Sequence, residues 1–302
     1  MNIKFILGSK DPEMLSIEKI LKKIGYEYEY AMKNGYLCNP TNSYECDNVI
    51  DKNSYNIIIF IECEHMNTIE NCIFIDHHRI GDYGYALDYR NFLEASSIGQ
   101  LYKYILTNDV KAIGKLDLKT EIIKCESNYF YYLDNNWYLN VKNFSVRIPE
   151  EIVLTAAIDH CLSDAYNDMC KGVSKNEIFD RQMKDIMQKY SISKYELAKL
   201  SEFYLSYIKE DQEEIIDLTH LDLGIGYSLQ YILLREVSLF NDKSIAVKSK
   251  NEHSNEDKLM LLGLKKCQVD SFLKKKRFSN LKLENHFGVP TRGYAGAIIK
   301  RH

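Results

Sequence analysis

Four short, mainly apolar runs within the first 160 residues lead into segments with acidic side chains, three of which also carry histidine. The pattern is weaker at the first run, where Gly8-Ser9-Lys10 comes before Asp11. The runs are Ile3–Leu7, Ile57–Ile61, Cys72–Ile75 and Ile152–Ile158. A sharp change from apolar to polar residues is typical of a buried element that ends at a site. In open α/β sheets, ligands bind at the carboxyl ends of the strands. If the runs are neighbouring strands, or strands and a packed helix, their polar residues converge on one edge.

The residues between these runs predict an α/β layer with a mainly parallel sheet. Strands are expected at 3–7, 26–31, 55–61 and 73–75, and helices at 13–24 and 97–107. In the first helix, Leu15, Ile20, Leu21 and Ile24 share one face, and Gly25 favours a stop. Residues 129–139 indicate a β-hairpin, and helices are expected to dominate from Glu150 to Ile208.

The polar residues that follow the runs are candidate residues of a divalent-metal or phosphate site. Carboxylates and neutral imidazoles together suit Mn²⁺, Mg²⁺ or Zn²⁺. The plainer interpretation is a set of surface turns in which the histidines are coincidental. The candidates, in chain order, are Asp11, Glu62, Glu64, Asp76, His77, His78, Asp159 and His160.

Three segments of the chain resemble the DHH phosphoesterase family, which includes RecJ-type exonucleases and nano-RNases. Asp76-His77-His78 matches the tripeptide that names the family. Ala95-Ser96-Ser97 is similar to the segment that opens a helix shortly after it. The glycine-rich stretch 288–296 resembles the substrate loop of the family's associated C-terminal domain. The resemblance implies metal-dependent hydrolysis of a phosphoester in a nucleotide or short oligonucleotide.

The resemblance also implies a role for each residue. The metal ligands would be Asp11, Glu62 or Glu64, His77, Asp159 and His160, with Mn²⁺ as the favoured ion. Asp76 would orient His77, and His78 would face the phosphate. The substrate would be held by Arg79 from the near side and by Arg292, Gly293 and Gly296 from the C-terminal domain.

The chain departs from the family in its first motif, which usually offers a histidine and two aspartates. Here the region reads Gly8-Ser9-Lys10-Asp11-Pro12-Glu13, with one matching acid and no histidine. Lys10 could occupy space that a metal ion normally neutralises. The alternative function is therefore a catalytically impaired relative that binds nucleotides or nucleic acid as a sensor.

Length and charge set the remaining expectations. A chain of 302 residues with a net charge of −4 is long enough for two domains and is too acidic overall to coat nucleic acid. We expect a catalytic domain over 1–190, a helical connector over 191–216 and a smaller α/β domain over 217–302. Residues 258–302 carry eleven Lys or Arg and two acids, which favours an anionic substrate.

Cysteine usage and hydropathy indicate the compartment. The eight cysteines form no Cys-x-x-Cys pair, which argues against a zinc ribbon and favours reduced, buried thiols. No apolar stretch approaches the roughly 20 residues that span a membrane. We therefore expect a cytoplasmic protein without a membrane partner; the sequence leaves its oligomeric state open.

Overall fold

The structure is a computed structural model that describes residues 2–300 with several gaps. The gaps are 41, 52–53, 86, 110, 122–128, 142–143, 210–213, 222–227, 251–256, 276 and 290–293. The chain separates into two compact units. The first contains Met1–Cys161 and Cys170–Gly172, and the second contains Leu162–Met169 and Val173–His302. The predicted domain limits at 190 and 216 stay a prediction.

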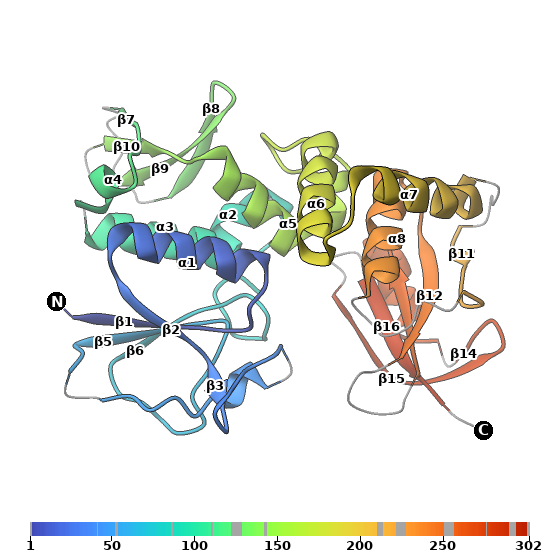
Figure 1. The fold of residues 1–302 in the computed structure, drawn as a ribbon, viewed down its shortest axis with the longest axis horizontal. Coiled ribbons are helices and arrows are strands. Elements are labelled where there is room, and N and C mark those ends of the chain that lie inside the picture. Colours follow the sequence, from blue (N-terminus) through green and yellow to red (C-terminus); the bar gives the residue numbers. More distant parts are fainter. Residues whose placement is uncertain are drawn as a thin grey trace. The chain divides into compact units, whose positions relative to one another are not determined.

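The first unit is built on a four-stranded parallel sheet in the order β2-β1-β5-β6. Helices α1 and α3 lie on one face of this sheet, and β3, which pairs with β4, lies toward the other (Figure 1). The bounds are β1 Ile3–Leu7, α1 Pro12–Ile24, β2 Glu27–Tyr30, β3 Met32–Lys33, β4 Tyr36–Leu37, η1 Ser43–Glu45, β5 Ile57–Ile61 and β6 Cys72–Ile75.

The rest of the first unit adds short helices and a second, antiparallel sheet in the order β7-β10-β9-β8. The β8–β9 pair is the predicted hairpin, and α5 carries the fourth apolar run. The bounds are η2 Tyr89–Asn91, α2 Phe92–Ala95, α3 Ser97–Asn108, α4 Lys111–Lys115, β7 Thr120–Glu121, β8 Phe130–Leu133, β9 Asn136–Val141, β10 Phe144–Arg147 and α5 Glu150–Tyr166.

The strand register of the parallel sheet brings three polar segments to the same level. Leu7 pairs with Ile61, and Ile61 pairs with Ile75, so the three strands end side by side. Gly8 N–H donates to Ile61 O at 2.8 Å, and Glu62 N–H donates to Ile75 O at 3.0 Å. The residues that follow the strands therefore share one edge of the sheet, as the sequence predicts.

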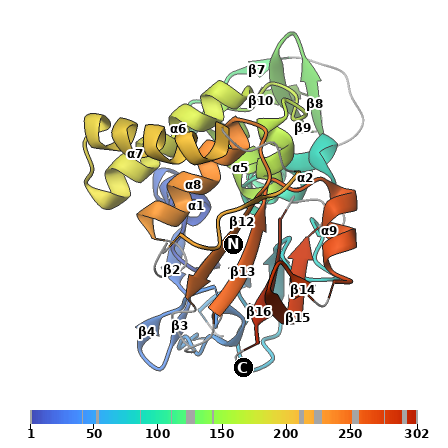
Figure 2. The same ribbon diagram turned by 90° about the vertical axis from the view of Figure 1, so that its right-hand side faces the viewer.

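The second unit contains a six-stranded sheet in the order β11-β12-β13-β16-β15-β14, of which Figure 2 labels β12 to β16. Its strands are antiparallel except for the β11–β12 pair. The bounds are α6 Lys175–Tyr190, α7 Lys194–Lys209, β11 Ile216–Asp217, α8 Leu229–Phe240, β12 Ile245–Lys250, β13 Asp257–Leu262, α9 Lys266–Phe272, β14 Arg277–Phe278, β15 Leu281–Val289 and β16 Tyr294–Ile299.

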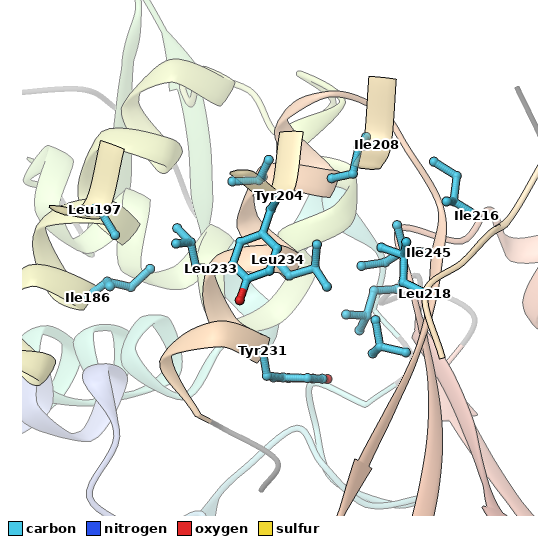
Figure 3. Close-up of a cluster of buried hydrophobic side chains, with 13 residues drawn as sticks. Ile186, Leu197, Tyr204, Ile208, Ile216, Leu218, Tyr231, Leu233, Leu234 and Ile245 are labelled. Atoms are coloured by element: carbon cyan, nitrogen blue, oxygen red, sulfur yellow. The ribbon is translucent and has the colours of Figure 1, made fainter. Parts of the chain in front are cut away.

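Successive side chains of β12 point to opposite faces of that sheet, and different helices cover the two faces. Ile245 and Val247 pack with α7 and α8 in one apolar cluster, part of which Figure 3 shows. Ala246, between them, packs with Phe272 of α9 in another cluster. The second unit is therefore a sheet with helices on both faces, and the predicted α/β class holds for both units.

One detail of the first helix differs from expectation. Ile20, Leu21 and Ile24 are buried as predicted, but the side chain of Leu15 is 37% exposed. Met14 and Ile17 take the buried positions of the first turns instead. Among the described helices, none is long and apolar enough to cross a membrane.

Candidate metal centre

Glu62 projects from the end of β5 in a backbone conformation that is unusual for its residue type. Its φ is +53°, in the left-handed region that favours glycine. Ser97, in the first turn of α3, donates from Oγ to Glu62 Oε1 at 2.8 Å. The carboxylate is 7% exposed. A buried carboxylate on a sterically costly backbone is a common feature of functional sites.

Glu13 lies beside Glu62 and was not among the predicted ligands. Its side chain is buried in the first turn of α1. The backbone N–H of Ile98, at the start of α3, donates to Glu13 Oε1 at 2.8 Å. The N-terminus of α3 therefore helps to hold the buried acid through a directed amide and the helix dipole.

His77 and Asp159 complete a four-residue cluster with these two glutamates. His77 Nε2 lies 2.9 Å from Asp159 Oδ2 and 3.4 Å from Glu62 Oε1. One donor atom from each of the four residues lies within 4.8 Å of those of the others. The four come from α1, the end of β5, the end of β6 and α5. Segments far apart in the sequence therefore meet at one point.

The arrangement of these atoms fits a divalent cation. Three carboxylates and one imidazole form a mixed oxygen and nitrogen donor set that suits Mn²⁺, Mg²⁺ or Zn²⁺. Glu13 Oε2 and His77 Nε2 are buried, and neither atom accepts a hydrogen bond from any N–H or hydroxyl group that the structure describes. A buried polar atom without a hydrogen bond is costly, and a cation between these atoms would satisfy both.

The electrostatics point the same way. Burial, with the charges of Asp159 and Glu62, raises the pKa of Glu13 well above its usual range. Burial, with the charges of Glu62 and Asp159, raises the pKa of Asp11 to about 8. Carboxylates packed this closely cannot all ionise cheaply unless a positive charge joins them.

Asp76 organises the segment after β6. Its Oδ1 accepts from the backbone N–H of His77 at 2.7 Å, from the N–H of His78 at 3.0 Å and from His78 Nδ1 at 3.0 Å. Tyr44 OH donates to Oδ2 at 2.9 Å. Burial alone raises the pKa of Asp76, but the hydrogen bonds from His78 and Tyr44 outweigh it and lower the pKa.

His78 and Arg79 lie next to the cluster and are more exposed. The side chain of His78 is 35% exposed, and its Nδ1 lies 3.8 Å from Glu62 Oε1. The side chain of Arg79 is 41% exposed and lies over the ring of Tyr44, 4.0 Å from its centroid. Glu64 pairs with Arg79, from Nη1 to Oε2 at 2.7 Å. Of the two glutamates predicted as alternatives, the structure places Glu62 in the cluster.

Two further predicted ligands lie beside the cluster in other arrangements. Asp11 is the N-cap of α1 and accepts from the Met14 N–H at 2.8 Å. His160 lies behind His77, with the two Nδ1 atoms 3.2 Å apart. Lys10 Nζ lies 5.6 Å from the centre of the Tyr30 ring.

Of the three predicted substrate-binding residues in the second unit, the structure describes one. Arg292 and Gly293 lie outside the described residues. Gly296 lies in β16, where an added Cβ would come 2.5 Å from the ring of Phe287. Close packing within the sheet is thus enough to explain this glycine.

Two glycines allow the segments that carry the proposed ligands to pack closely together. An added Cβ on Gly8 would lie 2.5 Å from the carbonyl oxygen of Glu62. On Gly84 it would lie 2.6 Å from His77 Cβ and 2.1 Å from Ala95 O. A larger residue at position 8 would press on the backbone of Glu62, and one at position 84 would press on the Ala95 carbonyl and on the side chain of His77.

Sequence reasoning missed Glu13, Ser97 as a partner of Glu62, and Tyr44. One signal was available for Glu13, because it follows Asp11 by two residues in the same loop-to-helix segment. Serine at the start of a helix is typically a cap, but Ser96 takes that role by accepting from the Gly99 N–H, and Ser97 binds Glu62 instead. No pattern in the sequence points to Tyr44, whose contact with Asp76 spans 32 residues.

Comparisons with known proteins give little beyond this geometry. No family model matches the chain, and no curated protein matches its sequence. Among solved structures, it is similar to a pGpG-specific phosphodiesterase, PggH from Vibrio cholerae, with 12% identity and a TM-score of 0.36. The match covers 98% of this chain and 93% of that chain. A likeness at this level carries no argument about function.

Proposed function

We propose that this protein is a metal-dependent phosphoesterase. The observation that carries the proposal is the convergence of Glu13, Glu62, His77 and Asp159, whose donor atoms lie within 4.8 Å of one another. We propose that they hold one divalent ion per chain, with Mn²⁺ favoured over Mg²⁺ or Zn²⁺. Such an ion would supply positive charge for phosphoryl oxygens and lower the pKa of water.

The neighbouring residues have the chemistry to bind a phosphoester. Asp76 fixes the ring of His78 through the bond to Nδ1, so that the ring, when both nitrogens carry protons, can donate from Nε2 to a phosphoryl oxygen. The guanidinium of Arg79, held by Tyr44 and Glu64, offers the planar donors that match a second phosphate oxygen. Asp11 is the N-cap of α1, and the Ile98 N–H at the start of α3 donates to Glu13, so two helix N-termini lie beside the donor set.

The substrate class of the proposal is a nucleotide or short oligonucleotide. It rests on the resemblance of Asp76-His77-His78 and Ala95-Ser96-Ser97 to the DHH family. The basic C-terminal region, which includes Arg292 and Gly293, would contribute charge to the same anionic substrate.

The test combines metal content with turnover. We expect the purified protein to hold about one divalent ion per chain and to release mononucleotide or phosphate from a panel of nucleotides and dinucleotides with Mn²⁺. Glu13→Gln should lose both properties, whereas Glu45→Gln, a change in an exposed acid paired with Lys33, should keep them. Turnover that Glu13→Gln matches would contradict the proposal. Metal and nucleotide binding without turnover would favour the sensor function instead.

A further inference from the structure

We propose that His160 is a positioning residue that holds the proton of His77 on Nδ1, so that His77 Nε2 presents a lone pair to the acidic cluster. The inference deepens the proposed function, because it concerns how one ligand of the metal centre is prepared. It reassigns His160 from a metal ligand, as the sequence predicted, to a partner of a ligand.

The backbone carbonyl of Leu87 fixes the tautomer of His160. His160 Nε2 lies 2.9 Å from Leu87 O. A carbonyl oxygen can only accept a hydrogen bond, so His160 Nε2 must carry the proton. The position of Leu87 O is itself fixed by a turn, in which the Leu87 N–H donates to Gly84 O at 3.2 Å.

The hydrogen bond from His160 Nε2 to Leu87 also determines whether His160 Nδ1 is a donor or an acceptor. In a neutral imidazole with Nε2 protonated, Nδ1 is an acceptor. His160 Nδ1 lies 3.2 Å from His77 Nδ1, so His77 must donate from Nδ1. A neutral His77 protonated on Nδ1 has its lone pair on Nε2.

The surroundings of His77 Nε2 agree with a lone pair at that position. The atom is buried, with Glu62 and Asp159 oxygens at 3.4 Å and 2.9 Å. Despite these short distances, no described residue makes a hydrogen bond with it. A protonated Nε2 would be expected to aim its N–H at one of the oxygens. A lone pair aimed between them is the arrangement that a cation requires.

The contacts from Leu87 through His160 to His77 are held in place because both imidazole rings are buried in the protein. His77 is 2% exposed and His160 is 4% exposed. Gly84 packs against His77 at the base of the ring. Partners that fix the ring orientation and tautomer of a ligating histidine typically change metal affinity by 10–100-fold when they are removed.

The test uses two substitutions that separate the acceptor from the packing. His160→Leu fills the space without an acceptor, and His160→Asn places an amide oxygen where Nδ1 stands. We expect the Kd for Mn²⁺ to rise by about 10–100-fold in His160→Leu, and most of this loss to be recovered in His160→Asn. Equal affinity of wild type and His160→Leu, or no recovery in His160→Asn, would overturn the proposal.

A spectroscopic readout tests the proton position without substitution or turnover. Long-range ¹H–¹⁵N correlation on the wild type, recorded at alkaline pH without metal and again with Zn²⁺, reports which nitrogen of His77 bears the proton. We expect Nδ1 in both samples; a proton on Nε2 in the metal-free protein overturns the proposal. If the protein binds metal but hydrolyses no phosphoester, the proposed function fails while this result still stands, so the two failures are distinguishable.

Discussion

At the scale of single residues, two acids two positions apart have different surroundings. Glu62 is buried and accepts from Ser97, whereas Glu64 is half-exposed and pairs with Arg79. The sequence alone could not choose between them, because both follow the same strand. The choice follows from the left-handed backbone at Glu62, which turns its side chain toward α3.

This difference gives a matched pair of substitutions. We expect Glu62→Gln to lower Mn²⁺ occupancy sharply, because it removes a charged ligand, and Glu64→Gln to leave occupancy close to that of the wild type. Elemental analysis after dialysis measures both. Similar occupancy in the two variants would mean that Glu62 is not a ligand.

At the scale of elements, local patterns predicted most helices and strands of the first unit, and tertiary packing decided the rest. The helix over residues 13–24 was predictable because its apolar spacing and Gly25 are local signals; Gly25 indeed has φ +85°. The burial of Glu13 was not predictable, since it depends on an amide of α3 that lies 85 residues away. The same holds for His77 and His160, which meet across 83 residues.

The close approach of Gly84 to the end of β6 gives an element-scale prediction. We expect Gly84→Ala to weaken Mn²⁺ binding by at least tenfold, because its Cβ would displace either His77 or Ala95. Gly114→Ala is the control, since an added Cβ there meets nothing within 4 Å and alanine favours the helix α4. Calorimetric titration with Mn²⁺ compares the two variants. Unchanged affinity in Gly84→Ala would show that His77 and Ala95 can shift without weakening metal binding.

A second element-scale prediction concerns the joint between α1 and β2. Glu18 accepts from Lys22 at 2.6 Å, from Tyr28 OH at 2.8 Å and from Tyr30 OH at 3.0 Å. The hydrogen bond from Lys22, with those from the tyrosines, lowers the pKa of Glu18 to about 2. The folded pKa is below the unfolded value of about 4.3. This contribution is therefore present above the unfolded pKa and is lost as the pH falls toward 2.

Thermal unfolding of Glu18→Gln tests this assignment. We expect the wild type to melt above the variant at pH 6, and the difference to shrink at pH 3. Glu70→Gln, in an exposed acid, controls for the loss of one charge. A difference that stays constant between the two pH values would exclude ionisation of Glu18 as its origin.

At the scale of the whole molecule, the proposed metal centre draws on residues from 13 to 159. The unfolded chain does not hold these residues together, so a bound ion stabilises the native state alone. The predicted α/β class follows from composition and periodicity, but the meeting of the four ligands does not. The cytoplasmic location and the predicted domain limits stay predictions at this scale.

The consequence is a metal-dependent shift in unfolding. At a free Mn²⁺ concentration 100 times the Kd, binding adds about 2.7 kcal/mol to the free energy of unfolding of the part that binds it. We expect differential scanning calorimetry to show a transition that moves to higher temperature with Mn²⁺ and returns with a chelator. His77→Ala should abolish the movement; a shift of the same size in that variant would place the ion elsewhere.

The glycines at positions 8 and 84 have a consequence for mutational maps of this protein. Neither carries a functional group, yet each leaves no room for a side chain beside a proposed ligand, Glu62 or His77. In a saturation scan scored by activity, both positions should be as intolerant as the acids and the histidine that they adjoin. A map scored by activity alone would therefore not distinguish these packing glycines from the residues that bind the metal. A parallel scan scored by protein abundance would separate the two groups.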